Sequence, residues 1–361
     1  MESTIIKASP EIRYQAELDR LVQMDNKSKP EGWRLSPQAV RKFILGAPEI
    51  EVSRKFYGND ALVERAIVTL MGNQGLMLVG EPGTAKTFLS ELLAAAISGD
   101  SGLTIQGTAG TTEDQLKYTW NYALLLAEGP SERALVPAPV YQGMTQGKLV
   151  RFEEITRCPP EVQDGVISIM SDKQLLIPEW GDKGRIYAKR GFNLIATANL
   201  RDRGVNEMSA ALKRRFNFET VQPISDPEFE TKLVLQEVTQ QLEQTDTKVE
   251  LSTDVIRMLV TAFQDLRQGQ TGDGVQVKSP DTVMSTAEAV NVVLSAALRS
   301  AYLGEGKLCA EDVAAQLWGV AVKDNAEDRK KLKHYLNTVG QERARKDKHW
   351  KALVKVAGQL E

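Results

Sequence analysis

The chain has 361 residues, of which 42% are apolar, so it can bury a sizeable core and form two or three domains. A net charge of −3 gives no overall basic signal for nucleic acid, and two distant cysteines, Cys158 and Cys309, exclude a disulfide framework and a zinc site. We expect a soluble, cytoplasmic protein without a membrane segment, because neither a leader peptide nor an apolar run long enough to span a bilayer is present.

Helices are predicted ahead of the first strand. Apolar residues at helical spacing predict a helix over residues 11–24. Ser36 followed by Pro37 predicts an N-cap and the start of a second helix, and a third helix begins near Asp60. Residues 1–50 are therefore expected to form an N-terminal helical extension.

A glycine-rich stretch follows an apolar strand predicted at residues 76–79 and precedes an amphipathic helix. Gly80 and Gly83 let successive backbone N–H groups point inward, and the helix N-terminus adds partial positive charge, so this stretch suits a phosphate group. Lys86 would reach the β- and γ-phosphates of ATP, and the Thr87 hydroxyl would bind Mg²⁺. The predicted nucleotide-binding residues are Gly80, Glu81, Pro82, Gly83, Thr84, Ala85, Lys86, Thr87 and Phe88. A glycine-rich turn with a chance Lys-Thr pair is the less favoured interpretation.

Ala85 is the one departure from the phosphate-binding pattern G-x-x-x-x-G-K-[ST]. The change from glycine adds only a methyl group. We expect it to be tolerated if Ala85 has helical backbone angles.

Five short apolar strands alternate with helical patterns. They are predicted at residues 76–79, 103–105, 148–152, 192–197 and 218–221. This alternation indicates parallel pairing with right-handed crossovers, so the predicted fold class is α/β, with a doubly wound parallel five-stranded sheet whose ligand lies at the carboxyl ends of the strands. Arg151 conflicts with the pattern, because a central parallel strand is buried on both faces.

Beyond Pro223 the pattern is helical throughout. We therefore predict a nucleotide-binding core at residues 51–224, an all-helical lid domain at residues 225–325 and a basic helical tail at residues 326–361. Residues 329–355 contain ten Lys or Arg and two acids. A solvated helix is favoured for this segment over a contact with a polyanion or a partner.

Two carboxylates and an amide follow neighbouring strands. Glu153 and Glu154 end the strand at residues 148–152, where the doubly wound topology brings them beside the glycine-rich loop. Glu153 would hold the Mg²⁺ shell, Glu154 would polarise the attacking water, and Asn199 would orient the same water. Taken alone, two glutamates indicate an ordinary helix N-terminus, and an asparagine that closes a strand indicates a turn.

Arg214 and Arg215 lie in a basic cluster before the last strand. An exposed arginine there would act on the nucleotide of a neighbouring subunit and spread the charge that develops during hydrolysis. The alternative is a solvated basic helix end.

These residues resemble an AAA+ ATPase of the MoxR branch, which is related to dynein-related and McrB-type modules. Residues 80–87 are similar to the MoxR form of Walker A, and residues 153–163 resemble its Walker B segment. The similarity begins at Tyr57 and extends to the third helix of the lid. Residues 106–147 fit the helix 2 insert of this branch, and residues 175–189 fit its hairpin before sensor 1.

The resemblance implies roles for the site residues. Glu154 takes the role of the catalytic glutamate, Asn199 falls at sensor 1, and Arg215 falls at the arginine finger, with Arg214 as the alternative. ATP and Mg²⁺ are the implied cofactors. The implied function is that of a hexameric ring that hydrolyses ATP to remodel a protein partner, as a MoxR-type chaperone does, and the implied partner is a von Willebrand A domain protein.

Two departures support alternative functions. Glu153 replaces the usual Asp, and Asp281 replaces the usual sensor 2 Arg, which leaves open whether Lys278 takes that place. A nucleotide-gated binding module with weak or lost hydrolysis is therefore the first alternative. Arg203 and Gly204 resemble the McrB type, so a McrB-like NTPase motor of a nucleic-acid system is the second, for which the basic tail would bind nucleic acid. The chain is also similar to the YehL-type MoxR proteins.

Overall fold

The computed structural model of the chain describes three ranges, namely residues 7–199, 206–282 and 284–358. The chain divides into two compact units. One comprises the residues up to Gln222 apart from Pro82–Thr84, and the other begins at Pro223. The finer division predicted from the sequence stays a prediction.

Within the residues that the structure describes, four α-helices and the short 3-10 helix η2 (Pro48–Ile50) precede the sheet. The α-helices are α1 (Pro10–Arg13), α2 (Gln15–Met24), α3 (Pro37–Leu45) and α4 (Asp60–Met71). The helix predicted over residues 11–24 is interrupted at Tyr14, whose φ of −115° and ψ of 26° are not helical. The predicted N-cap is confirmed, since the Ser36 Oγ accepts a hydrogen bond of 3.2 Å from the backbone N–H of Ala39.

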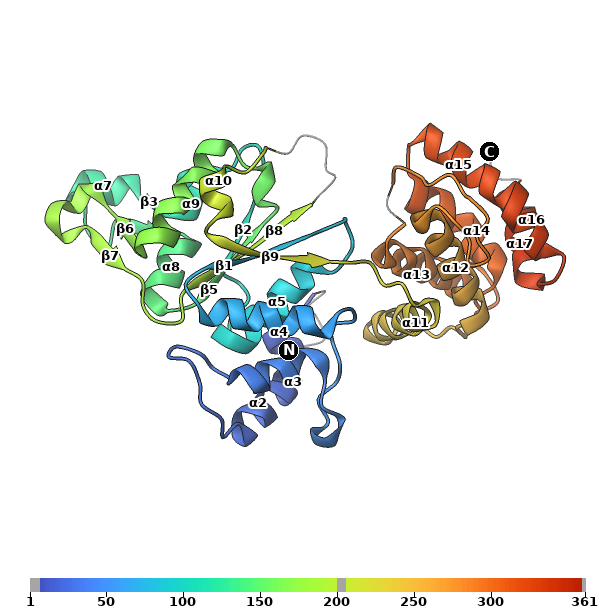
Figure 1. The fold of residues 1–361 in the computed structure, drawn as a ribbon, viewed down its shortest axis with the longest axis horizontal. Coiled ribbons are helices and arrows are strands. Elements are labelled where there is room, and N and C mark those ends of the chain that lie inside the picture. Colours follow the sequence, from blue (N-terminus) through green and yellow to red (C-terminus); the bar gives the residue numbers. More distant parts are fainter. Residues whose placement is uncertain (1–6, 200–205, 283, 359–361) are drawn as a thin grey trace. The chain divides into compact units, whose positions relative to one another are not determined.

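The first unit contains a five-stranded parallel sheet in the order β2-β5-β8-β1-β9 (Figure 1). Its strands are β1 (Gly75–Gly80), β2 (Thr104–Gln106), β5 (Leu149–Glu153), β8 (Asn193–Asn199) and β9 (Phe216–Val221). The predicted doubly wound sheet is confirmed. Gly80 pairs with Asn199, and Gln106 pairs with Glu153, so these four strands end at one edge of the sheet.

Helices α3, α4 and α5 (Lys86–Ser98) cover one face of this sheet, and α8 (Pro139–Gln146) and α9 (Pro160–Asp172) cover the other. The other helices that the structure describes between β1 and β9 are α6 (Glu113–Leu116), α7 (Tyr122–Glu128) and α10 (Ala210–Lys213). Successive side chains of a strand point to opposite faces. Leu76 and Leu78 accordingly join a buried cluster with residues of α3, α4 and α5, whereas Met77 and Val79 join one with residues of α8 and α9. Both faces are therefore dry, as a parallel sheet requires.

Two antiparallel pairs lie outside the main sheet. They are β3 (Tyr118–Trp120) with β4 (Leu135–Pro137), and β6 (Gln174–Leu176) with β7 (Arg185–Tyr187). The second pair confirms the hairpin predicted at residues 175–189, and the first lies within the predicted insert. Glu179, in the turn η4 (Pro178–Lys183), joins the two, because its carboxylate accepts hydrogen bonds of 3.0 Å from the Tyr118 hydroxyl and from Trp120 Nε1.

The second unit is helical in every element that the structure describes. These elements are α11 (Pro227–Gln244), α12 (Thr253–Gln268), α13 (Thr286–Leu303), α14 (Ala310–Leu317), η5 (Trp318–Val322), α15 (Ala326–Tyr335), η6 (Leu336–Gly340), α16 (Gln341–Ala344) and α17 (Lys348–Ala357). Within the described ranges, no helix combines the length and the apolarity needed to cross a lipid bilayer.

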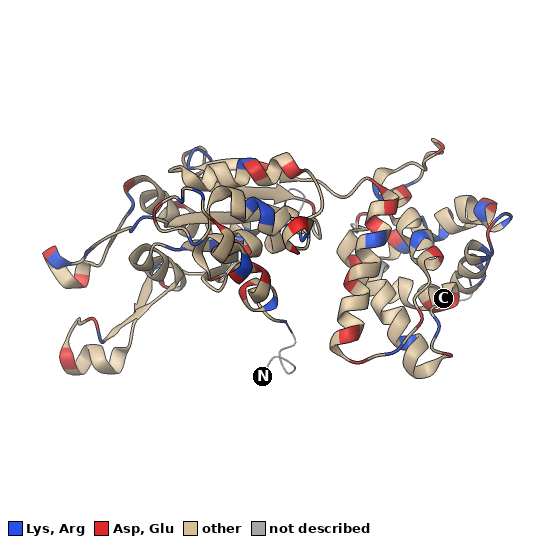
Figure 2. Ribbon diagram, turned by 90° about the horizontal axis from the view of Figure 1, so that it is seen from below, with Lys and Arg blue, Asp and Glu red and all other residues tan. Residues whose placement is uncertain are grey.

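The basic C-terminal segment contributes to the core of this unit. Tyr335 and Leu353 are no more than 1% exposed and belong to the same buried cluster as the lid helices. Lys348, Lys351 and Lys355 of α17 are exposed. The solvated-helix interpretation therefore applies only to the outer side of the segment. Figure 2 shows that basic and acidic residues are interspersed over each unit.

Candidate nucleotide-binding site

The loop between β1 and α5 turns through left-handed backbone conformations. Gly83 has a φ of 74°, which glycine adopts without strain. Ala85 has a φ of 63° and a ψ of 23°, so the helical backbone angles under which alanine was expected to be tolerated are not present. The reason is that α5 begins at Lys86, and Ala85 must make the turn into it. A left-handed conformation costs an L-residue about 1 kcal/mol, which the loop tolerates.

Lys86 folds back over the loop from which it emerges. Its ammonium group donates hydrogen bonds to the carbonyl oxygens of Gly80, at 3.2 Å, and Glu81, at 2.7 Å. The residue is 7% exposed. A cation is thus fixed at the first turn of α5, where the helix N-terminus already favours an anion. The side chain of Phe88 packs against the buried cluster beneath α5 instead.

Glu153 meets the loop through Thr87, as the sequence predicted. Its Oε2 atom accepts hydrogen bonds from the hydroxyls of Thr87, at 2.8 Å, and Thr197, at 2.7 Å. Its Oε1 atom lies 2.7 Å from the Ser90 Oγ and from Arg151 Nη2. The carboxylate is therefore buried and bonded on both oxygens.

Glu154 points away from Glu153 and faces Asn199. The Asn199 Nδ2 atom lies 2.9 and 3.0 Å from the two carboxylate oxygens, and Arg157 Nε lies 3.3 Å from Oε2. Glu154 has a left-handed backbone, with a φ of 56°, and its N–H donates to the Thr197 hydroxyl at 3.0 Å. Thr197 thus bonds to the side chain of Glu153 and to the backbone of Glu154.

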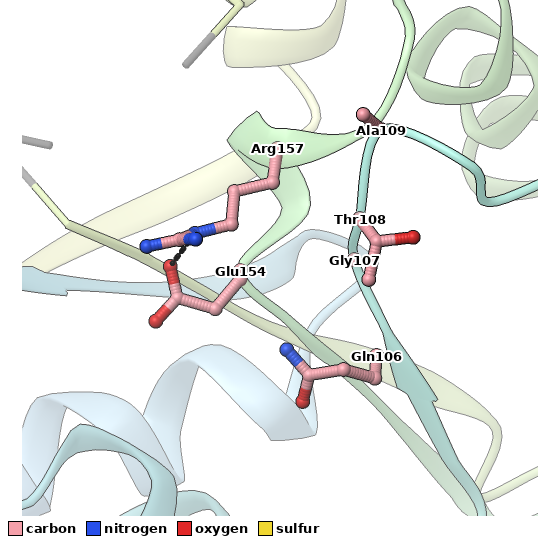
Figure 3. Close-up of a pocket in the computed structure, with 6 residues that line it drawn as sticks. All are labelled: Gln106, Gly107, Thr108, Ala109, Glu154 and Arg157. Atoms are coloured by element: carbon pink, nitrogen blue, oxygen red, sulfur yellow. Dashed lines mark hydrogen bonds and ion pairs between the residues drawn. The ribbon is translucent and has the colours of Figure 1, made fainter. Parts of the chain in front are cut away.

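A cavity of about 370 Å³ opens beside Glu154 (Figure 3). It is lined by Gln106, Gly107, Thr108, Ala109, Glu154 and Arg157. Gly107 is required there, since a Cβ atom on it would lie 2.3 Å from the Glu154 carbonyl oxygen. A small polar molecule beside the Glu154 carboxylate would fit this space.

Arg214 and Arg215 lie at the opposite edge of the sheet. The backbone N–H of Gly75, at the start of β1, donates to the Arg215 carbonyl oxygen at 2.8 Å. Gly80 ends the same strand about 16 Å away, which is farther than an arginine side chain reaches. Arg215 bonds to the Ser171 Oγ and to the Ala211 carbonyl oxygen, whereas the exposed Arg214 guanidinium makes no hydrogen bond or ion pair to a residue that the structure describes.

Asp281 has a structural contact in the second unit. Its N–H donates to Asp328 Oδ1 at 2.7 Å, and its own carboxylate lies 3.2 Å from Lys331 Nζ. The residue therefore anchors the loop before α13 to α15. Arg203 and Gly204 lie outside the described residues.

Four residues of this site were not predicted from the sequence. Ser90 follows Thr87 by three positions and so shares its helix face, and Thr197 precedes Asn199 by two positions in a strand and so shares its sheet face. Arg151 had been noticed only as an anomaly. Nothing in the sequence singled out Arg157, which contacts Glu154 because the chain turns after β5.

A parallel sheet of this order, with a glycine-rich loop after β1, two carboxylates after β5 and an asparagine closing β8, defines an AAA+ P-loop NTPase. Two family models match the chain, an AAA domain of the dynein-related subfamily over residues 75–216 and the YehL-like AAA+ ATPase C-terminal domain over residues 228–361. The chain belongs to the YehL-like AAA+ ATPases of the MoxR type, which confirms the resemblance noted in the sequence.

Two related proteins support this assignment, and the chain is also similar to a solved structure. The chain is 50% identical over 353 residues to the uncharacterized protein YehL of Escherichia coli (strain K12), across 97% of this chain and 96% of YehL. It is 28% identical over 186 residues to the chaperone MoxR1 of Mycobacterium tuberculosis, across 51% of this chain and 45% of MoxR1. The ADP complex of NtrX from Brucella abortus matches with a TM-score of 0.47 at 15% identity, across 68% of this chain and 51% of that one.

Proposed function

We propose that this protein is a ring-forming ATPase that couples ATP binding and hydrolysis to the remodelling of a protein partner. One observation carries the proposal. The P-loop cation, two glutamates and an asparagine from three separate segments converge at one edge of the sheet, where a doubly wound fold binds its ligand.

ATP would lie against the loop at residues 80–88. Lys86 already places its ammonium group over the loop, and the N–H groups at the start of α5 face the same region. Binding would exchange the carbonyl contacts of Lys86 for contacts with the β- and γ-phosphates. The family supports nucleotide binding, and the loop geometry supports these residues as its location.

The oxygens of Thr87 and Glu153 suit Mg²⁺. This ion is usually held by one or two protein oxygens together with substrate phosphates, and the Thr87 hydroxyl and the Glu153 carboxylate lie 2.8 Å apart. When bound, the ion would offset negative charge on the phosphates. No cluster of three or more His, Cys, Asp or Glu that could hold a metal occurs within the described ranges, so the phosphates would complete the site.

Glu154 is the proposed general base. Its carboxylate borders the cavity. Glu154 and Arg157 are the two ionisable residues among those that line this cavity, and Glu154 is the acid. Asn199 holds both carboxylate oxygens and would set their orientation toward the water. A general base in this position typically accelerates a reaction about 100-fold or more.

Replacement of the base gives the direct test. Glu154→Gln keeps the shape and the hydrogen bond to Asn199, and it removes the negative charge. We expect phosphate release to fall about 100-fold or more, while the affinity for ATP is retained. Measurement of phosphate release and ATP affinity, with the mass of the assembly recorded with and without ATP and Mg²⁺, checks this expectation. Hydrolysis at the unchanged rate would place the base elsewhere.

A protein partner is supported by the exposed insert. Helix α7 has no buried residue, and its Leu126 and Tyr122 are 89% and 68% exposed. Exposed apolar side chains that are grouped on one element indicate a contact surface for another protein. A von Willebrand A domain protein and a cytoplasmic location stay predictions from the family resemblance and the composition.

A nucleotide-gated module with weak hydrolysis is the second candidate. It is favoured by the state of the two glutamates, whose oxygens are all bonded to protein groups in the structure. These protein groups compete with a metal ion and with the attacking water for the carboxylate oxygens. Turnover at saturating ATP, with and without Mg²⁺, separates the two functions, because a gated module would show ATP-dependent assembly without appreciable phosphate release.

A further inference from the structure

Arg151 is a buried cation in β5, an interior strand of the sheet. It is 5% exposed, and its guanidinium has three hydrogen-bond partners. Nε donates to the Ser90 Oγ at 2.9 Å, Nη1 donates to the Ser101 carbonyl oxygen at 2.9 Å, and Nη2 donates to Glu153 Oε1 at 2.7 Å. The Glu153 carboxylate, next to the P-loop, neutralises the charge of Arg151. This ion pair explains how an arginine can occupy a strand that is buried on both faces.

The sequence spacing produces this contact. Arg151 and Glu153 are two positions apart in a strand, so their side chains emerge on the same face of the sheet. Helix α5 packs on β5 and brings Ser90 to the same place. Ser90 lies one turn beyond Thr87, so Arg151, Ser90 and Thr87 surround one carboxylate.

The two carboxylate oxygens of Glu153 therefore have different hydrogen-bond partners. Oε1 is engaged by Arg151 and Ser90, deep in the unit. Oε2 accepts hydrogen bonds from the hydroxyls of Thr87 and Thr197. A glutamate has one more methylene and one more torsion than an aspartate, so its carboxylate needs an additional anchor to be held in one orientation.

We propose that Arg151 is a positioning residue that adapts the longer Glu153 to hold Mg²⁺. The guanidinium draws Oε1 back into the unit and presents Oε2 beside the Thr87 hydroxyl. The inference rests on the proposed function, because it assumes that Glu153 and Thr87 hold the ion that accompanies ATP. Groups that orient a metal-binding side chain typically change metal affinity by about 10- to 100-fold when they are removed.

A purely structural ion pair makes a different prediction. If Arg151 only stabilises the fold, its replacement lowers thermal stability and leaves the gain in ATP affinity that Mg²⁺ provides unchanged. The decisive quantity is therefore a ratio, the dissociation constant of a fluorescent ATP analogue in EDTA divided by that in excess Mg²⁺. This ratio does not depend on hydrolysis.

The test compares Arg151→Leu, Glu153→Asp and the double variant. The first change removes the guanidinium and the second shortens the acid, so each breaks the match between the two side chains, and we expect the ratio to fall about tenfold in each. In the double variant a shorter acid no longer needs the guanidinium, so we expect the ratio to return to within about threefold of the unchanged protein. Two single losses that simply add in the double variant, or a ratio that stays unchanged in all three, would overturn the inference.

Two further variants keep the test decisive if a single variant folds poorly. Arg151→Lys retains the charge but cannot reproduce the forked contact to Ser90 and Glu153, so we expect the ratio to fall about as far as in Arg151→Leu. Glu91→Gln is the matched control. Glu91 Oε1 lies 3.6 Å from Arg151 Nη2 without contacting Glu153, and its replacement should leave the ratio unchanged. An unchanged ratio in Arg151→Lys would contradict the inference.

The outcomes also separate this inference from the proposed function. If the unchanged protein binds ATP more tightly with Mg²⁺ and no variant alters the ratio, the role of Arg151 is wrong while the proposed ATPase stands. If the unchanged protein binds no ATP with or without Mg²⁺, the proposed function fails, and the inference fails with it.

Discussion

Ala85 illustrates how one backbone angle affects the site. Its left-handed conformation carries a strain that glycine would not have. We expect Ala85→Gly to raise the free energy of unfolding by about 0.5 kcal/mol, because relief of this strain exceeds the added freedom of the unfolded chain. Urea denaturation measures the change.

Ala61 of α4 is the control for this prediction. It is an exposed helical residue, so Ala61→Gly should lower the free energy of unfolding by about 0.5 kcal/mol. Opposite signs for the two changes identify backbone strain at Ala85. A loss of stability in both variants would show that the left-handed angle at Ala85 costs less than the freedom that glycine adds to the unfolded chain.

At the site, residue identities could be predicted from the sequence, but side-chain partners could not. Glu153, Glu154 and Asn199 were found because acids and amides that follow buried strands converge in a parallel sheet. The hydrogen bonds of Glu153 and Glu154 with Thr197 and the left-handed angle at Glu154 depend on atoms far apart in the chain. A pattern of residue types carries no information on such contacts.

At the scale of elements, Asp328 joins α15 to the loop that precedes α13. Its carboxylate accepts hydrogen bonds of 2.6 to 2.7 Å from the N–H groups of Asp281 and Thr282 and from the Thr282 hydroxyl, and it lies 3.5 Å from Lys331 Nζ. Burial alone would raise the pKa of Asp328, but these hydrogen bonds and the Lys331 charge lower it below its usual range.

This lowered pKa gives a pH-dependent prediction. Asp328→Asn should reduce the free energy of unfolding by about 3 kcal/mol at pH 7, because it removes the acceptor charge of several hydrogen bonds. The folded state binds the proton of Asp328 more weakly than the unfolded chain does, so the stabilisation is complete above the unfolded pKa, near pH 4, and is lost as the pH falls through the lower folded pKa.

Denaturation of the two proteins between pH 3 and pH 7 tests this expectation. The stability difference between them should shrink as the solution is acidified below about pH 4. Asp324→Asn removes the same charge from an exposed neighbouring position and should change stability by less than about 0.5 kcal/mol. A difference between wild type and Asp328→Asn that is constant over the whole range would show that the charge of Asp328 does not stabilise the fold.

The sequence predicted helices and strands better than it predicted interruptions within a helix. The strands and the cap at Ser36 followed from apolar runs and turn chemistry, which act locally. The interruption of the first helix at Tyr14 was missed. The apolar spacing continues through Tyr14, so periodicity does not reveal the break, and the Tyr14 ring packs edge-on against Phe43 of α3.

At the scale of the whole molecule, the position of Arg214 and Arg215 requires a second subunit if either acts on ATP. The P-loop of the same chain lies at the other edge of the sheet. We expect Arg214→Ala or Arg215→Ala to lower the hydrolysis rate of the assembled protein about 1000-fold, as removal of a trans-acting arginine does elsewhere. Phosphate release by the two separate variants identifies which arginine acts.

Mixing provides the control for this prediction. The inactive arginine variant still carries Glu154, and Glu154→Gln still carries the arginine, so a random one-to-one ring should recover about a quarter of the wild-type sites. Phosphate release that stays at the level of the separate variants after mixing would show that the arginine does not act between subunits.

The sequence alone determined the fold class, the nucleotide-binding loop and the residue types at the carboxyl ends of the strands, because these depend on local periodicity, on glycine and on the topology that parallel strands impose. The tertiary structure decided which of those residues touch one another. It brought Ser90 and Thr197 to Glu153, placed Asn199 against Glu154 and buried part of the basic tail, since each of these contacts depends on packing between segments that are distant in the chain.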